Sequence, residues 1–149
     1  MIKKQGIKIN EETIKVIESF IQAKLPQEYR DFLLKYNGGV PNKGVFNLNN
    51  ILSGLSFFYI INSLNNYSDF VGAYHLYKDR IPKGFIVVAS DVGGNKILIG
   101  LDGENRNKIY FWDHENEVEE DEEPYYDNMT LIADGFNLFL NSLVLDWED

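Results

Sequence analysis

The sequence predicts an α+β fold: one domain in which helices near both ends flank a mostly antiparallel sheet. Apolar residues recur at helical spacing near the N-terminus and again near the C-terminus, as expected for helices packed on a core. Between these regions lie short apolar runs separated by stretches rich in Asn and Gly. Such short separators favour antiparallel pairing, because parallel strands need a long crossover.

The chain of 149 residues is expected to form one domain, residues 1–149. A domain of about this size buries enough surface to fold without a metal or a disulfide. The sequence contains no cysteine, which excludes disulfides, thiolate metal sites and cysteine nucleophiles. No cofactor is expected. The N-terminal stretch lacks an apolar signal region and no apolar run is long enough to span a bilayer, so we expect a cytoplasmic protein that does not contact a membrane.

The first expected helix follows Asn10, which is a suitable N-cap because its side-chain oxygen can accept a backbone N–H. The acids Glu11 and Glu12 favour a first turn. Its apolar stripe consists of Ile14, Ile17 and Ile21.

The second expected helix has a start signal, a stripe and a stop signal. Pro26 suits a first helical position, because its missing N–H would be unpaired there anyway. Apolar residues follow at helical spacing through Tyr36, and an Asn-Gly-Gly stop supplies left-handed conformations. The most distinctive residues of this segment are Leu25, Pro26, Tyr29, Phe32, Leu33, Asn37, Gly38 and Gly39.

The middle of the chain predicts strands, with one short helix among them. Strands are expected at residues 45–46, 57–61, 85–90, 96–101 and 108–113, from their apolar content and flanking turns. Ser68 or Asp69 is expected to cap a helix that runs to Lys78, with Phe70, Tyr74 and Tyr77 on one side. The last helix is expected over residues 133–145.

The negative charge is concentrated in one segment. Residues 113–127 contain nine acids and no Lys or Arg, and removing these nine from the 23 acids leaves 14, equal to the 14 Lys and Arg. The segment is either a solvated loop or a surface that attracts a cationic partner. Nucleic-acid binding is disfavoured because it needs clustered cations. The candidate partner-binding residues are Trp112, Asp113, Glu115, Glu117, Glu119, Glu120, Asp121, Glu122 and Glu123.

Tyr110 and Trp112 are expected on one face of their strand, with Ile109 and Phe111 on the other. Because both faces are apolar, one of them needs a second cover, either a helix or a partner protein. Helix cover is the simpler of the two interpretations.

Recognisable catalytic and metal-binding patterns are missing from the sequence. Asp102 to Asn107 departs from the calcium-loop pattern and is expected to be a turn. Gly93-Gly94-Asn95 is followed by a strand, whereas phosphate-binding loops precede a helix. His75 and His114 are isolated, and nothing in the sequence pairs the carboxylates of Asp91, Asp102 and Asp134. No catalytic or metal-binding residues are assigned, and the protein is not expected to be an enzyme.

The ordered set of motifs resembles the SUKH superfamily. The family usually has a glutamate seven residues before its Leu-Pro and a leucine three residues after that glutamate; Glu18 and Ile21 occupy these positions. Gln22 stands where a glycine is common, so a differently shaped turn is expected. The resemblance continues through three later stretches and spans about residues 11–145. These stretches are Ile81 to Ile97, Tyr110 to Glu115 and Ala133 to Leu140.

The superfamily includes bacterial toxin-immunity proteins and fungal regulators of cell-wall synthesis of the SMI/KNR type. The resemblance implies a twisted, mostly antiparallel sheet flanked by helices, and a non-catalytic protein that neutralises a cognate toxin, often a nuclease, by direct contact. The partner would then be a cationic toxin domain. A regulatory or scaffold protein with several partners remains the alternative, and a carboxylate-dependent hydrolase or metal-binding enzyme is a third class. This third class requires carboxylates that converge in a cleft.

Overall fold

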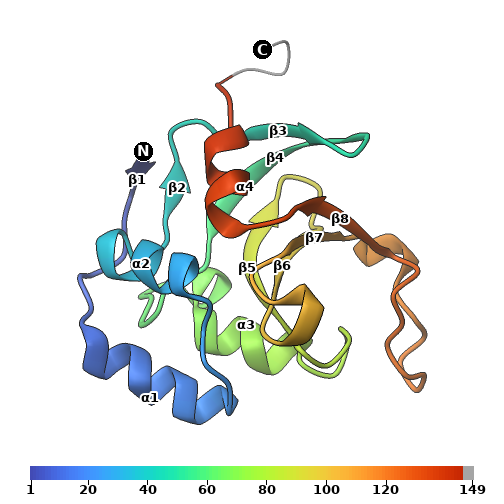
Figure 1. Cartoon of the computed structure of the whole chain (residues 1–149), viewed down its shortest axis with the longest axis horizontal. Helices are drawn as coiled ribbons and strands as arrows, with labels where there is room; N and C mark the ends of the chain where they lie inside the picture. Colours follow the sequence, from blue (N-terminus) through green and yellow to red (C-terminus); the bar gives the residue numbers. More distant parts are fainter. Residues whose placement is uncertain (146–149) are drawn as a thin grey trace.

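The central sheet contains six strands in the order of the sequence, each antiparallel to its neighbour. The computed structural model describes residues 1–145, and Figure 1 shows how the helices flank this sheet. A two-stranded sheet of β1 and β2 adjoins it, because Gly39, just before β2, exchanges two backbone hydrogen bonds with Phe58 of β4 at 3.1 and 2.7 Å. The expected α+β class and antiparallel pairing are confirmed. The strands are β1 (Ile2–Lys3), β2 (Val40–Pro41), β3 (Val45–Leu48), β4 (Ile51–Phe58), β5 (Phe85–Asp91), β6 (Lys96–Gly100), β7 (Ile109–Trp112) and β8 (Met129–Ala133).

Helices cover both faces of the sheet. On one face, Phe58 of β4 packs on Phe32 at 4.8 Å between ring centroids, and Phe32 packs on Phe136 at 5.1 Å. On the other face, Trp112 of β7 packs on Tyr77 at 5.9 Å. The α-helices of the described residues are α1 (Glu11–Ile21), α2 (Gln27–Lys35), α3 (Phe70–Tyr77) and α4 (Phe136–Ser142).

The first helix forms where it was predicted. Asn10 caps it, its side-chain oxygen accepting the Thr13 N–H at 3.1 Å. The predicted stripe Ile14, Ile17 and Ile21 is buried. The helix ends at Gln22, whose φ of 58° is left-handed. This is a conformation that glycine adopts without steric cost, so Gln22 bears a strain that glycine would not.

The second helix is confirmed with a shift of one residue at its start. Pro26 is the N-cap and not the first helical residue: its ψ of 145° is extended, and its carbonyl accepts the Arg30 N–H at 3.0 Å. The helix ends before Asn37, Gly38 and Gly39, which all have positive φ. A Cβ on Gly38 would lie 2.3 Å from the backbone oxygen of Tyr59, so only glycine fits there. The stripe residues Tyr29, Phe32 and Leu33 are buried.

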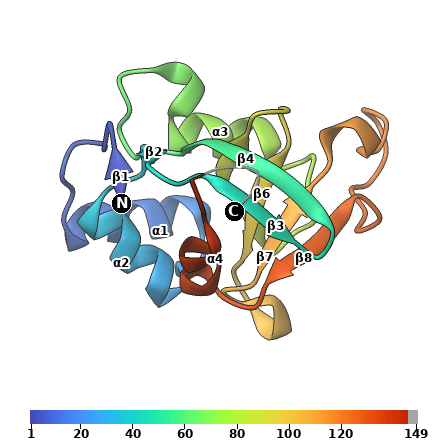
Figure 2. The same ribbon diagram turned by 90° about the horizontal axis from the view of Figure 1, so that it is seen from above.

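One strand was placed too late. Strand β4 covers Ile51–Phe58, where residues 57–61 were expected, and it forms a hairpin with β3. The turn of this hairpin is Asn49-Asn50, both with positive φ, as a two-residue turn requires. The Asn49 side chain donates to the Leu131 carbonyl of β8 at 2.9 Å. The sheet therefore curves until its first hairpin reaches its last strand (Figure 2).

The C-terminal helix expected over residues 133–145 is confirmed, but it is shorter at both ends. Residues Met129–Ala133 form β8, which pairs with β7, and α4 covers only Phe136–Ser142. Leu143 is extended, and Val144 exchanges two backbone hydrogen bonds with Val45 at 2.8 and 3.0 Å. Tertiary pairing at both ends shortens the helix. The short helix predicted after Asp69 is confirmed as α3, with the Asp69 carboxylate accepting the Gly72 N–H at 3.0 Å.

Candidate partner-binding surface

Residues 113–127, hereafter the acidic loop, connect β7 to β8. This loop contains the nine acids. The base of the loop is closed by Asn128, whose carbonyl accepts the Asp113 N–H at 2.9 Å and whose side chain donates to the Asp113 carbonyl at 3.0 Å. The Asp113 carboxylate accepts the Glu115 N–H at 3.0 Å and so starts a short 3₁₀ turn. Further along, the Tyr125 hydroxyl donates to the Asn116 carbonyl at 2.7 Å. The loop thus contains its own internal contacts.

A neighbouring turn supports the base of the loop. The Asn95 side-chain oxygen accepts the His114 N–H at 3.2 Å, and the His114 ring lies 2.9 Å from the Gly93 carbonyl. That turn is itself fixed by Asp91, which is 4% exposed and accepts the N–H groups of Gly93 and Asn95 at 2.9 and 2.7 Å. The carboxylate of Asp91 therefore has a structural role in the β5–β6 turn.

One acid of the loop has a cationic partner from elsewhere in the chain. Arg80, just after α3, donates two hydrogen bonds to the Glu117 carboxylate, at 3.1 and 2.6 Å. This bidentate contact raises the pKa of the Arg80 guanidinium. Residues 113–127 contain no Lys or Arg, so Arg80 supplies one of the nine acids with a cation from elsewhere in the chain.

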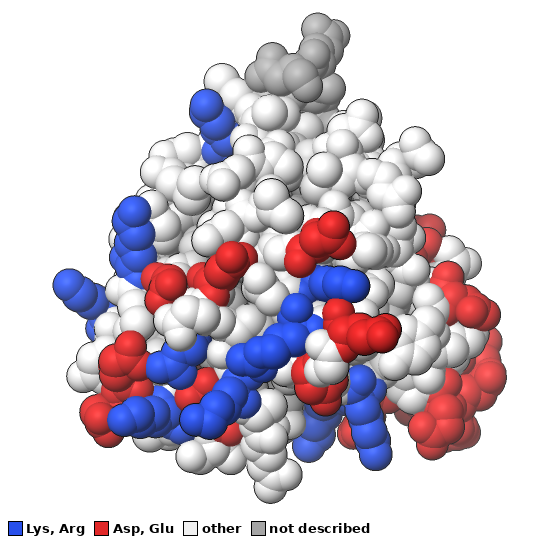
Figure 3. Space-filling model, in the orientation of Figure 1, with Lys and Arg blue, Asp and Glu red and all other residues white. Residues whose placement is uncertain are grey.

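The other acids of the loop, apart from Asp113, are exposed and make no ion pair with the described residues. In Figure 3 the red side chains form one group at the right edge, where Figure 1 draws the loop before β8, whereas red and blue are interspersed over the helices on the left. Charge of one sign is therefore concentrated at one end of the molecule. The exposed acids are Glu115, Glu119, Glu120, Asp121, Glu122, Glu123 and Asp127.

Two hollows lie between the acidic loop and the end of α3. The first has a volume of about 480 Å³ and contains five carboxylates and the single cation Arg80. Its lining is Asp79, Arg80, Glu117, Val118, Glu119, Glu120 and Glu122. The second, of about 550 Å³, also includes Lys78 and Lys83. Carboxylates therefore outnumber cations in both hollows, five to one in the first and five to two in the second.

Trp112 does not belong to the accessible surface. Its side chain is 1% exposed and packs edge-on against Tyr77 of α3. Helix cover of this strand face, the simpler of the two interpretations, is what the structure has. The expectation that Trp112 contacts a partner is wrong for its side chain, because strand alternation places it under α3.

Sequence reasoning missed two cations near this site. Arg80 pairs with an acid 37 residues away, which no local pattern predicts. Lys96 is 8% exposed, with its ammonium 2.9 Å from the Ser90 hydroxyl and 5.2 Å from the Tyr77 ring centroid. Burial lowers the pKa of Lys96.

The remaining titratable candidates do not form a common site. Asp91 is buried in its turn, whereas Asp102 and Asp134 are exposed. His75 lies exposed on α3, and His114 is at the base of the loop. Among residues 1–145 there is no group of three or more His, Asp or Glu side chains arranged to hold a metal ion. Asp91, Asp102 and Asp134 are therefore not brought together into a metal site within the described part of the chain.

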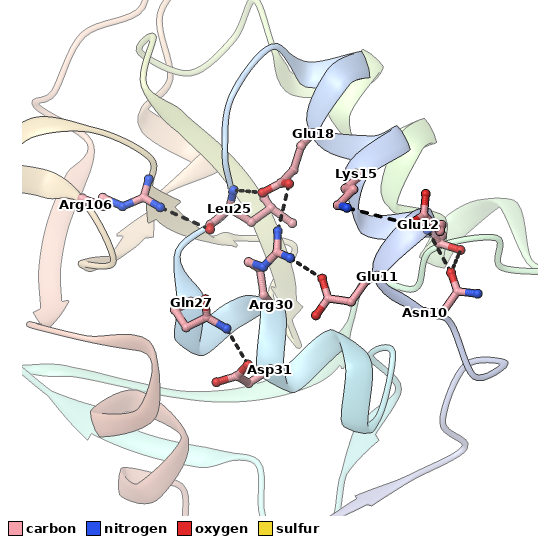
Figure 4. A network of polar contacts seen from close by, with 11 residues as sticks. Asn10, Glu11, Glu12, Lys15, Glu18, Leu25, Gln27, Arg30, Asp31 and Arg106 are labelled. Carbon is pink, nitrogen blue, oxygen red and sulfur yellow. Dashed lines mark hydrogen bonds and ion pairs between the residues drawn. The ribbon is translucent and has the colours of Figure 1, made fainter.

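The distinctive second helix lies away from the acidic loop, beside a polar network between α1 and α2 (Figure 4). Glu18 accepts the Leu25 N–H at 2.7 Å and the Arg30 guanidinium at 2.8 Å. Arg30 also binds Glu11, and Arg106 donates to the Leu25 carbonyl at 3.2 Å. The signature residues therefore build the fold and do not line the candidate surface.

Together, the curved antiparallel sheet and the helices on both of its faces define an α+β domain, in which the Glu18–Leu25 contact joins α1 to the start of α2. The model of the SMI1/KNR4 family (SUKH-1) matches residues 8–142, so the chain belongs to this family. The resemblance noted in the sequence is thereby confirmed. The chain is also similar to the SPbeta prophage-derived uncharacterized protein YokK of Bacillus subtilis (strain 168). The identity is 31% over 155 residues, covering 89% of this chain and 73% of the relative.

None of the helices in the described residues is both long enough and apolar enough to cross a bilayer.

Proposed function

We propose that the protein is an immunity protein that binds a cognate bacterial toxin domain and neutralises it by direct, non-catalytic contact. The observation that carries this proposal is the group of seven exposed carboxylates on the acidic loop of a SUKH-1 family member. The proposed contact residues are those of the loop: Asp113, Glu115, Glu117, Glu119, Glu120, Asp121, Glu122 and Glu123. Trp112 is not among the proposed contact residues, because it is part of the core beneath the loop.

The charge of the loop supports a cationic partner. Carboxylates of one sign on one end of a small protein attract a positive surface and raise its association rate by about 10–1,000-fold at low salt. The same field repels the phosphates of a nucleic acid. A toxin that is itself a nuclease fits this surface well, because its substrate site must be positive and the loop can occupy the place of phosphate. The proposed setting is the cytoplasm, where such a toxin acts.

The decisive experiment co-expresses this protein with toxin domains encoded beside its gene and scores growth. The expected result is rescue by the unmodified protein. A matched variant in which Glu119, Glu120, Glu122 and Glu123 are replaced by Gln should rescue less well at the same expression level. Failure to bind or rescue against every neighbouring toxin would overturn the proposal.

The alternative is an intracellular regulatory or scaffold protein that binds several partners, as in the fungal branch of the superfamily. The observation that favours it is the pair Lys78 and Lys83, which adds two cations to the five carboxylates of the second hollow. It predicts several partners of modest affinity and a gene without a toxin neighbour. The gene neighbourhood therefore separates the two proposals before any binding experiment.

A further inference from the structure

Arg80 occupies a position that limits its movement on several sides. Its guanidinium lies 4.6 Å from the ring centroid of Tyr77 and 5.8 Å from that of Trp112. Both rings belong to the layer between α3 and the sheet, and they favour a cation over their faces. The two hydrogen bonds to Glu117 leave from the free edge of the guanidinium. Arg80 therefore connects the rigid core to the acidic loop.

The contact with Glu117 is partly shielded from water. The side chains of Arg80 and Glu117 are 38% and 23% exposed, so the pair is less screened than a fully exposed one. Bidentate geometry adds directional restraint to the attraction. Beyond Glu117, the loop from residue 118 to residue 124 has a single backbone hydrogen bond of its own, from the Glu122 N–H to the Glu119 carbonyl at 3.0 Å. Among the described residues, Arg80 is thus the one cation paired with the charged tip, whose two ends are joined by the hydrogen bond of 2.7 Å from the Tyr125 hydroxyl to the Asn116 carbonyl.

We propose that Arg80 is a positioning residue that holds the acidic loop in one conformation before a partner arrives. Ordering a loop during folding avoids the entropic cost of ordering it on binding. The lower entropic cost of partner binding rests on the proposed function. The order of the loop is independent of that function, because it is a property of the isolated protein.

The first experiment measures backbone order parameters of residues 117–123 by NMR, without any partner. Rigid backbone has values of about 0.85 and flexible backbone values below about 0.6. We expect rigid values in the unmodified protein and flexible ones in Arg80→Gln and in Glu117→Gln. The double variant should be no more flexible than either single variant, since Arg80 acts through Glu117. Glu119→Gln, which removes an exposed acid of the same loop, is the matched control and should leave the order unchanged.

A loop that is already flexible in the unmodified protein, or that keeps its order in Arg80→Gln, would overturn the proposal. Additive loosening in the double variant would also contradict it, because Arg80 would then act by another route. These outcomes require no toxin, so they are separate from failure of the proposed function.

Where a toxin partner is in hand, the kinetics give a second measurement. Arg80→Gln should raise the dissociation rate on the order of tenfold, because hydrogen bonds to charged groups contribute at least that factor. The association rate of Arg80→Gln and its salt dependence should be no lower than those of the unmodified protein, since the exposed carboxylates remain. A variant that dissociates no faster would overturn the link between loop order and binding.

Discussion

The Glu18 carboxylate accepts the backbone N–H of Leu25 at 2.7 Å. Leu25 directly precedes Pro26, the N-cap of α2, and Pro26 itself has no N–H to donate. The same carboxylate binds Arg30 of α2, so one side chain of α1 fixes both the entry to α2 and its first turns. This contact gives a physical reason for the spacing of seven residues between Glu18 and Leu25 in this chain.

Glu18→Ala should lower the free energy of unfolding by about 2–4 kcal/mol, because two charge-assisted hydrogen bonds are lost and Arg30 is left with a weaker partner. The side chain of Glu18 is only 10% exposed, so water replaces these bonds poorly. Urea unfolding measures the change. Glu11→Ala is the control: it also removes a carboxylate from Arg30, but Glu11 is 55% exposed and its loss should cost less than about 1 kcal/mol. Equal costs for the two variants would contradict this account.

Asn37 has a role beyond ending α2. Its side chain is 1% exposed; it donates to the carbonyls of Ile7 and Ile61, both at 2.8 Å, and accepts the Ile61 N–H at 2.9 Å. Asn37→Ala should therefore destabilise the protein by about 3 kcal/mol, since three backbone groups lose their partner and the two groups of Ile61 are buried. Asn37→Gly should cost about 1 kcal/mol less, because glycine relieves the left-handed φ of 50°. Thermal unfolding of both variants tests this order, and a Gly variant less stable than the Ala variant would refute it.

Tyr29 buries a hydroxyl that has no hydrogen-bond partner among the described residues. Tyr29→Phe should therefore stabilise the fold by about 1 kcal/mol near neutral pH. Tyr36→Phe, at a half-buried position two helical turns later, is the control and should change stability little. Loss of stability in Tyr29→Phe would show that the hydroxyl has a favourable contact.

The same residue gives a pH dependence. Burial raises the pKa of the Tyr29 phenol above its ordinary value of 10.0. Because its pKa is raised, the Tyr29 phenol holds its proton more tightly in the folded state than in the unfolded state. The stability that comes from this difference is complete below about pH 10 and is lost as the pH rises further. Above pH 10, the free energy of unfolding should fall less steeply with pH in Tyr29→Phe than in the unmodified protein. The difference in slope should be about 1.4 kcal/mol per pH unit. Denaturant titrations between pH 9 and 11 measure this slope, and parallel slopes for the two proteins would contradict the assignment.

Local patterns were sufficient to predict α1 and α2 from the sequence. Their caps, stripes and stop residues lie within one segment each, and Asn10, Phe32 and Gly38 all act as expected. Strand β8 was missed because Met129–Ala133 becomes a strand only through its pairing with β7. The start of β4 was missed for a similar reason, since its polar Ser53 is buried by the long-range hydrogen bond of its hydroxyl to Asp91.

The candidate surface was predictable as charge but not as structure. The sequence alone located the nine acids of residues 113–127. It did not indicate that Glu117 pairs with Arg80, because the two residues are 37 positions apart. Alternation along β7 correctly put Trp112 opposite Phe111, yet whether both faces are covered depends on the placement of α3. That placement is a tertiary property, which explains why Trp112 was misassigned to the partner surface.

We propose above all that the acidic loop meets a cationic partner. The most direct test is the rate at which this protein associates with a toxin domain encoded beside its gene. This rate is measured across a range of salt concentrations. The test variant replaces Glu119, Glu120, Glu122 and Glu123 by Gln, leaving Glu117 and its contact with Arg80 intact. Its association should be slower by about tenfold at low salt and its salt dependence flatter, with unfolding free energy nearly unchanged. An association rate equal to that of the unmodified protein at every salt concentration would contradict the claim and leave the loop as a solvated segment.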